Sequence, residues 1–121
     1  MARYLAEPNG SDITFTDVLR ALADPVRLRM LTVLADGEYH PCWPEEFLVG
    51  VHKSTLSHHF RVLREAGITR TRLEGRNYFV QLRREDLNSR FPGLLEAVLN
   101  GALESDVAEG YHVPGETVRG A

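Results

Sequence analysis

The chain has 121 residues, of which 43% are hydrophobic and 26% are charged, and this composition predicts a single globular domain with a modest core. No apolar run approaches the roughly 18 residues of a membrane span, and the N-terminus lacks the apolar centre of a signal peptide, so we expect a cytoplasmic protein without a membrane partner. The single cysteine, Cys42, has no partner for an internal disulfide, which agrees with a reducing compartment.

The formal net charge of −3 is unevenly distributed along the chain. Residues 52–84 hold eight Lys and Arg against two Glu, a balance of +6, whereas residues 1–51 and 85–121 carry −4 and −5. Phosphate neutralisation is local, so a basic block between acidic flanks suits a DNA-facing surface on an acidic body.

The first third of the chain predicts an arm followed by two helices. Residues 1–13 have no periodicity and contain Pro8 and Gly10, which predicts a loose N-terminal arm. Apolar residues then recur at the spacing of one helix face: Phe15, Val18, Leu19 and Leu22. This helix is expected to be capped by Thr14 or Thr16. A second helix is expected from Pro25 to about residue 35, because Asp24 is a good cap and proline is tolerated at the first helical position.

The segment from residue 38 to residue 52 is irregular, since Pro41 and Pro44 interrupt it. We expect a loop that holds His40 and Cys42, followed by a short helix over about residues 44–48. In a helix-turn-helix, such a helix crosses the DNA backbone and residues 50–53 form the turn.

Residues 53–67 predict the second helix of that pair. At 3.6 residues per turn, Leu56, Phe60 and Leu63 share one face, which should be buried. The opposite face collects side chains that can bind base edges and phosphates: Ser54, Ser57, His58, Arg61, Arg64 and Glu65. We expect Ser54 or Thr55 to cap this helix and a glycine at residue 67 to end it. An ordinary solvated face is the alternative interpretation.

Residues 68–73 and 78–82 are rich in β-branched, aromatic and aliphatic residues and flank a polar turn with Gly75, which predicts a β-hairpin. Arginines lie on its strand, at its tip and at its end: Arg70, Arg72, Arg76, Arg83 and Arg84. A hairpin that only covered a core would explain the apolar residues but not these arginines. The predicted fold is therefore mainly α with a small β-hairpin, a winged helix-turn-helix with the order α-α-α-α-β-β-α.

A last helix is expected from about Pro92, with a broad apolar stripe that exceeds what a terminal helix on so small a body needs. We expect the remaining apolar surface to form a subunit interface. The predicted organisation is a loose arm over residues 1–13, a winged helix domain over 14–107 and a disordered tail over 108–121.

Three motifs carry a family resemblance: ALADPVRLRMLTVL, KSTLSHHFRVLREAGI and the hairpin EGRNYFV. Together they resemble the ArsR/SmtB family of dimeric bacterial winged helix repressors, over about Phe15 to Leu103. The resemblance implies a homodimer built on the first and last helices, which binds a palindromic operator in double-stranded DNA and is released by an effector.

The same resemblance assigns residues to roles. Operator contacts fall on residues 54, 55, 57 and 58, with Arg61 and Arg76 on phosphate or minor groove, whereas His59 is read as structural. The complete set expected to bind DNA is Lys53, Ser54, Thr55, Ser57, His58, Arg61, Arg64 and Arg76. The set expected at the dimer interface is Val18, Leu22, Leu95, Val98, Leu99 and Ala102.

Metal sensors of the family commonly carry a cysteine pair before the turn, or Asp and His ligands on the last helix, and this sequence has neither set. We therefore predict no metal and no cofactor. His40 and Cys42, with His52 as a conceivable third ligand, keep open an alternative in which the repressor senses metal or redox state. The effector is unknown, and our hypothesis is a small organic molecule near the dimer helices, or none.

The sequence does not predict an enzyme. It has no glycine-rich phosphate loop, paired carboxylates at a defined spacing or nucleophile elbow. A winged helix that binds proteins instead of DNA is the remaining alternative from another class. Such a module would be expected to expose apolar residues on the face where this chain has Ser54 to Arg64.

Overall fold

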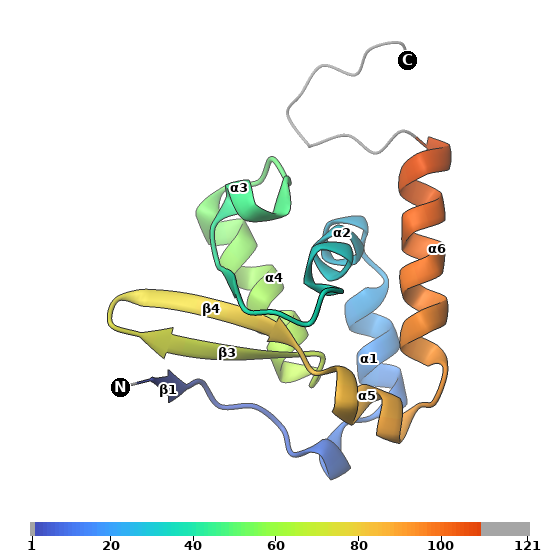
Figure 1. The fold of residues 1–121 in the computed structure, drawn as a ribbon, viewed down its shortest axis with the longest axis horizontal. Coiled ribbons are helices and arrows are strands. Elements are labelled where there is room, and N and C mark those ends of the chain that lie inside the picture. Colours follow the sequence, from blue (N-terminus) through green and yellow to red (C-terminus); the bar gives the residue numbers. More distant parts are fainter. Residues whose placement is uncertain (1, 110–121) are drawn as a thin grey trace.

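The computed structural model describes residues 2–109, and in it the helices gather beside a small antiparallel sheet whose hairpin projects from the body (Figure 1). The arrangement agrees with the predicted mainly helical winged helix-turn-helix. In chain order the elements are β1 (Arg3–Tyr4), a 3-10 turn η1 (Gly10–Asp12), α1 (Phe15–Leu22), α2 (Pro25–Leu34), β2 (His40–Pro41), α3 (Pro44–Phe47), α4 (Lys53–Glu65), β3 (Thr69–Glu74), β4 (Asn77–Leu82), α5 (Arg84–Arg90) and α6 (Leu94–Glu109).

The first two long helices begin where their capping residues predict. Thr14 Oγ1 accepts a hydrogen bond from the Asp17 backbone N–H at 3.3 Å, before α1. At the start of α2, one oxygen of the Asp24 carboxylate accepts from the backbone N–H groups of residues 26 and 27, at 2.8 and 3.0 Å. Pro25 follows this cap at the first helical position, so the cap satisfies the free donors of the first turn.

The helix-turn-helix consists of α3 and α4, joined by a turn in which Leu48 has a positive φ of 56°. The predicted inward face of α4 is confirmed, because Leu56, Phe60 and Leu63 are all buried. The ring of Phe60 meets the ring of Phe47 edge to face, with centroids 5.4 Å apart, and this contact packs α3 against α4.

The predicted cap of α4 is wrong. The helix begins at Lys53 and its capping position is His52, whose side chain makes no capping hydrogen bond. Ser54 and Thr55 therefore lie within the first helical turn, where both side chains are exposed. The helix starts earlier than a cap at either residue would predict. Both side chains therefore lie on the helix surface and do not cap its backbone.

The hairpin is confirmed, and two short strands extend it into a four-stranded sheet in the order β1-β3-β4-β2. Glu74 pairs with Asn77 across the turn, where Gly75 has a φ of +64°. Strand β2 pairs with β4, with His40 opposite Val80. Neither short strand was predicted, because two residues are too few to give a periodic pattern.

The N-terminal segment differs from the predicted loose arm. Strand β1 pairs with β3, and the Leu5 backbone N–H donates to the Thr71 carbonyl at 3.0 Å. Ile13 is 1% exposed and packs so closely on Gly67 that a Cβ there would lie 2.5 Å from Ile13 Cγ1. The segment is ordered because the edge of β3 offers unpaired backbone groups and the core offers a site for Ile13.

The last part of the described chain also departs from prediction. Helix α5 was not predicted, since its seven residues have only one buried side chain, Leu87. Helix α6 starts two residues after Pro92, once Gly93 has turned the chain at a φ of +87°. It runs to Glu109, past the predicted domain end at residue 107, and the rest of the predicted tail lies outside the described residues. No helix in the described part of the chain is long and apolar enough to cross a membrane.

Candidate nucleic-acid interface

The outward face of α4 presents the polar residues that the sequence predicted. All the candidate residues on this helix are exposed except Arg64, which is partly buried: Lys53, Ser54, Thr55, Ser57, His58, Arg61 and Arg64. The opposite face of the helix is fixed in the core, so these side chains are held outward by packing. The face therefore combines hydroxyls, an imidazole and cations on one rigid helix.

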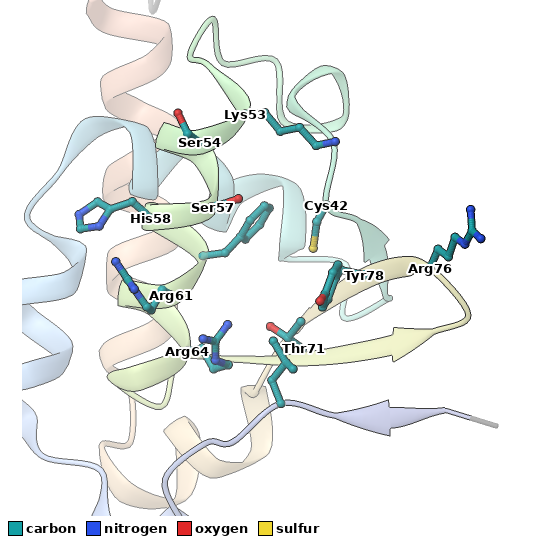
Figure 2. A pocket seen from close by; sticks show the side chains of 12 residues that line it. Cys42, Lys53, Ser54, Ser57, His58, Arg61, Arg64, Thr71, Arg76 and Tyr78 are labelled. Atoms are coloured by element: carbon teal, nitrogen blue, oxygen red, sulfur yellow. The ribbon is translucent and has the colours of Figure 1, made fainter.

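The hairpin contributes one exposed cation at its tip, Arg76 (Figure 2). The other arginines that the sequence placed on this surface make internal contacts. Arg70 Nε donates to Glu7 Oε2 at 3.2 Å, and the guanidinium of Arg72 lies 4.1 Å from the ring centroid of Tyr39. Both partners lie far away in the sequence, so spacing along the hairpin gave no indication of these contacts.

The last two arginines of the basic block also point inward. Arg83 is buried, and its guanidinium donates to Asp86 Oδ2 at 3.0 Å and to the Pro8 carbonyl at 2.8 Å. Arg84 donates to the carbonyl of Ala35 at the end of α2. The prediction that the hairpin and its end project five arginines is thus wrong for all but Arg76.

Four cations of the basic block remain available for a partner: Lys53, Arg61, Arg64 and Arg76. Within residues 2–109, none of them forms an ion pair or a side-chain hydrogen bond that would neutralise its charge. They belong to α4 and to the tip of the hairpin, so their charge is concentrated on one side of an otherwise acidic chain.

His59 links α4 to α2. Arg27 Nη1 lies 3.0 Å from His59 Nδ1. A guanidinium is only a donor, so His59 accepts this bond in its neutral form. Burial, aided by the adjacent charge of Arg27, lowers the pKa of His59 below its ordinary value. This supports the structural role expected for His59, and its partner on α2 became visible only in the folded chain.

Comparison with known proteins identifies the family. The family described as "Bacterial regulatory protein, arsR family" matches residues 46–71, from the end of α3 to the start of β3. The uncharacterized HTH-type transcriptional regulator YceK of Bacillus subtilis is 31% identical over 96 residues, which cover 78% of this chain and 96% of YceK. The chain belongs to the ArsR family of bacterial regulatory proteins.

Two further relatives are each similar over about two thirds or more of this chain. The HTH-type transcriptional regulator CmtR of Mycobacterium tuberculosis is 35% identical over 89 residues, covering 72% of this chain and 71% of CmtR. The biofilm growth-associated repressor of Agrobacterium fabrum is 38% identical over 81 residues, which cover 67% of this chain and 68% of that repressor. As an ArsR-family member, the chain is a DNA-binding transcriptional regulator and not an enzyme.

The two candidate metal ligands are His40 and Cys42, and His40 is hydrogen-bonded to carboxylates. His40 lies between two carboxylates, with Nδ1 2.6 Å from Glu46 Oε2 and Nε2 2.9 Å from Asp36 Oδ1. Burial opposes the charged imidazole, but the hydrogen bonds and charges of both carboxylates prevail and raise the pKa of His40. Among the residues described, no group of three or more His, Cys, Asp or Glu side chains is arranged to hold a metal ion.

Cys42 is a neutral thiol in this environment. Its burial raises its pKa to about 12, and the nearby charge of Arg64 only partly opposes this effect. A thiolate is the form that binds metals and reacts with oxidants, so Cys42 is poorly suited to either reaction in this state. The metal-sensing and redox-sensing alternatives therefore gain no support from these two residues.

The predicted dimer residues occupy a different environment from the one expected. Val18, Leu22, Leu95, Leu99 and Ala102 are buried within the chain and Val98 is partly buried, so they offer little surface to a partner. Among the side chains that the structure describes, the large apolar ones that α1 and α6 leave exposed are Phe15, Leu19 and Leu103, at 48%, 42% and 51%. The helical spacing identified the apolar stripe but not which of its edges faces outward.

Proposed function

We propose that this ArsR-family chain is a homodimeric repressor that binds a palindromic operator in double-stranded DNA, in the cytoplasm. The observation that carries the proposal is the outward face of α4, where hydroxyls, an imidazole and unpaired cations lie on one rigid helix. We place α4 in the major groove, so that two copies read half-sites whose centres lie about 34 Å apart.

The proposed contacts divide into two kinds. Ser54, Thr55, Ser57 and His58 lie on the N-terminal half of α4, which in helix-turn-helix proteins approaches the base edges. The cations of α4 and the hairpin tip would bind phosphates: Lys53, Arg61, Arg64 and Arg76. Base contacts would set sequence preference, whereas phosphate contacts would set affinity and salt dependence.

For the dimer we propose the exposed edge of the α1 and α6 stripe in place of its buried centre. Phe15, Leu19 and Leu103 would be covered by a second copy, since large exposed apolar side chains gain from being removed from water. Leu103→Glu is expected to shift the protein toward the monomer in sedimentation at micromolar concentration. Glu104→Gln, next to it on α6, is the matched surface control.

Selection of bound duplexes from a random DNA pool tests the central proposal. A recovered palindrome with half-sites about one helical turn apart is the expected result. A protein that sediments as a monomer and recovers no palindrome would contradict the dimeric repressor. A protein that recovers no DNA at all would favour a winged helix that binds proteins.

Variants then separate the two kinds of contact. His58→Ala is expected to relax the sequence preference, because it removes a proposed base contact. Arg76→Ala is expected to weaken binding to all sequences and to lower the slope of log K against log salt by about 1. Arg20→Ala, which removes an exposed arginine from α1, is the control for a general loss of charge. Equal losses of specificity in His58→Ala and Arg76→Ala would show that the contacts are misassigned.

A further inference from the structure

A hollow of about 550 Å³ lies between α4 and the β3–β4 hairpin, on the side that would face DNA (Figure 2). Its volume falls within the range of about 300 to 1,000 Å³ that is typical of small-molecule sites. Figure 2 shows Cys42, Thr71 and Tyr78 near one another on the hairpin side of this space, opposite Arg64 of α4.

Part of the lining is apolar. Leu5 from the N-terminal segment, the buried ring of Phe60 and the thiol of Cys42 come together in the hollow from three separate parts of the chain. A neutral thiol packs as a small hydrophobic group, and its pKa of about 12 keeps Cys42 in this form. The hollow can therefore accommodate an apolar ligand body.

The charged part of the lining has one sign. Lys53, Arg61, Arg64 and Arg76 all line the hollow, and no carboxylate does. These are the same four cations that have no ion-pair partner within the described chain. Unpaired cations beside an apolar surface favour a ligand with an anionic group.

Thr71 supplies a separate indication of a ligand. Its side chain is 2% exposed, it lines the hollow, and its Oγ1 has no hydrogen-bond partner in the described structure. A buried hydroxyl without a partner is costly. Because Thr71 Oγ1 is sealed from water, a ligand oxygen in the hollow would accept its hydrogen once the side chain rotates toward the hollow. Thr69, two residues earlier on the same strand, is equally buried and unpartnered but does not line the hollow.

We infer that this hollow binds a small organic anion with an apolar body, such as an aryl carboxylate, and that the bound anion competes with DNA for the cations of α4. The second half of this inference rests on the proposed function, in which α4 contacts the operator. It places the effector between the recognition helix and the wing instead of near the dimer helices. Because binding is reciprocal, a ligand held by Arg64 lowers the affinity for DNA, and DNA lowers the affinity for the ligand.

The direct test is calorimetric titration of the full chain with 2-naphthoate. Two controls separate its chemical features: 2-naphthalenemethanol keeps the apolar body without the charge, and sulfate keeps an anionic charge without the body. We expect 2-naphthoate to bind at least tenfold more tightly than either control. Equal binding of sulfate would overturn the inference, because the hollow would then be a general phosphate groove. Equal binding of the alcohol would overturn the assignment of an anionic ligand.

Matched variants locate the site. Thr71→Val keeps the shape of the side chain and removes the hydroxyl, so the affinity for 2-naphthoate should fall about tenfold. Thr69→Val removes the equivalent hydroxyl outside the hollow and should leave this affinity within about twofold. Cys42→Phe is the second variant, for use if Thr71→Val does not fold. It fills the apolar part of the hollow and should weaken the binding of 2-naphthoate. Equal affinities in Thr71→Val and Thr69→Val, or unchanged binding in folded Cys42→Phe, would place the ligand elsewhere.

Competition against a fluorescent DNA duplex completes the test. In the parent protein 2-naphthoate should raise the apparent Kd for DNA, and in Thr71→Val the same effect should need about tenfold more ligand. If 2-naphthoate does not bind while DNA does, the inference fails and the proposed function stands. If 2-naphthoate binds in the hollow but the protein binds no DNA, the ligand site stands and the proposed function fails.

Discussion

Arg83 offers the most specific prediction about stability, because its side chain is almost completely buried at 3% exposure. Its guanidinium donates to Asp86 Oδ2 at 3.0 Å and to the Pro8 carbonyl at 2.8 Å, and it lies 3.5 Å from Glu7 Oε2. In Arg83→Met the apolar stem is kept and these contacts are lost. The Glu7 carboxylate, of which Oε1 already has no partner, is then left with Arg70 as its cation.

The magnitude follows from this geometry. Removing one member of a buried charge pair costs about 3 to 5 kcal/mol, and we take about 3 because Asp86 is 37% exposed and can be solvated. In urea, with a slope of roughly 1 to 3 kcal/mol per molar for a small domain, this loss lowers the unfolding midpoint by about 1.5 M. Loss of the contact to Pro8 should also make the N-terminal segment more sensitive to limited proteolysis.

Arg70→Met is the matched control, because Arg70 contacts the same two carboxylates from a position that is 34% exposed. Its solvated ion pairs should contribute about 1 kcal/mol or less. Both variants remove one arginine from the same cluster, so they differ mainly in burial. Urea midpoints that fall equally in the two variants, or an Arg83→Met midpoint that matches the parent, would refute the argument that burial of Arg83 anchors the N-terminal segment.

Three further predictions concern the core, the turns and pH. Phe60→Ala should lower the free energy of unfolding in urea by about 3 to 5 kcal/mol. Arg61→Ala should leave the urea midpoint unchanged and weaken DNA binding. A Phe60→Ala midpoint equal to that of the parent would mean that the buried face of α4 is wrongly assigned. Gly67→Ala combines a φ of +84° with a clash against a buried side chain, so it should destabilise more than Gly75→Ala, which has open space at a φ of +64°; equal calorimetric melting temperatures would contradict this. The carboxylates around His40 raise its folded pKa above the ordinary 6.5. The contribution of His40 to the free energy of unfolding is therefore fully present below about pH 6.5, and it is lost as pH rises through the folded pKa. In urea unfolding, His40→Gln should remove that decline, and an identical pH profile would refute the assignment.

Local pattern was sufficient for much of the fold. The 3.6-residue spacing of Leu56, Phe60 and Leu63 determined which face of α4 is buried, and hence which face carries the polar side chains. Asp24 fixed the start of α2, because a capping side chain acts on backbone groups only two or three residues away. Gly75 located the hairpin turn for the same reason, since φ and the turn type are local properties.

The shortest elements were beyond the reach of local pattern. Strand β1 has two residues, and it is a strand only because it lies along the free edge of β3, about seventy positions later in the chain. Helix α5 buries a single side chain, Leu87, so no apolar period marks it. For these segments the tertiary surroundings determine the backbone conformation.

The sequence by itself determined the fold class, the helix-turn-helix and the polar face of α4, because each depends on spacing within a single element. Only the tertiary structure decided which members of a patterned set are available to a partner. Arg70 and Arg83 carry the same charge as Arg76, yet they are paired with carboxylates from distant segments while Arg76 remains exposed. The hollow that contains Thr71 likewise exists because the N-terminal segment, α4 and the hairpin meet, and contacts over such sequence distances are not encoded in any local period.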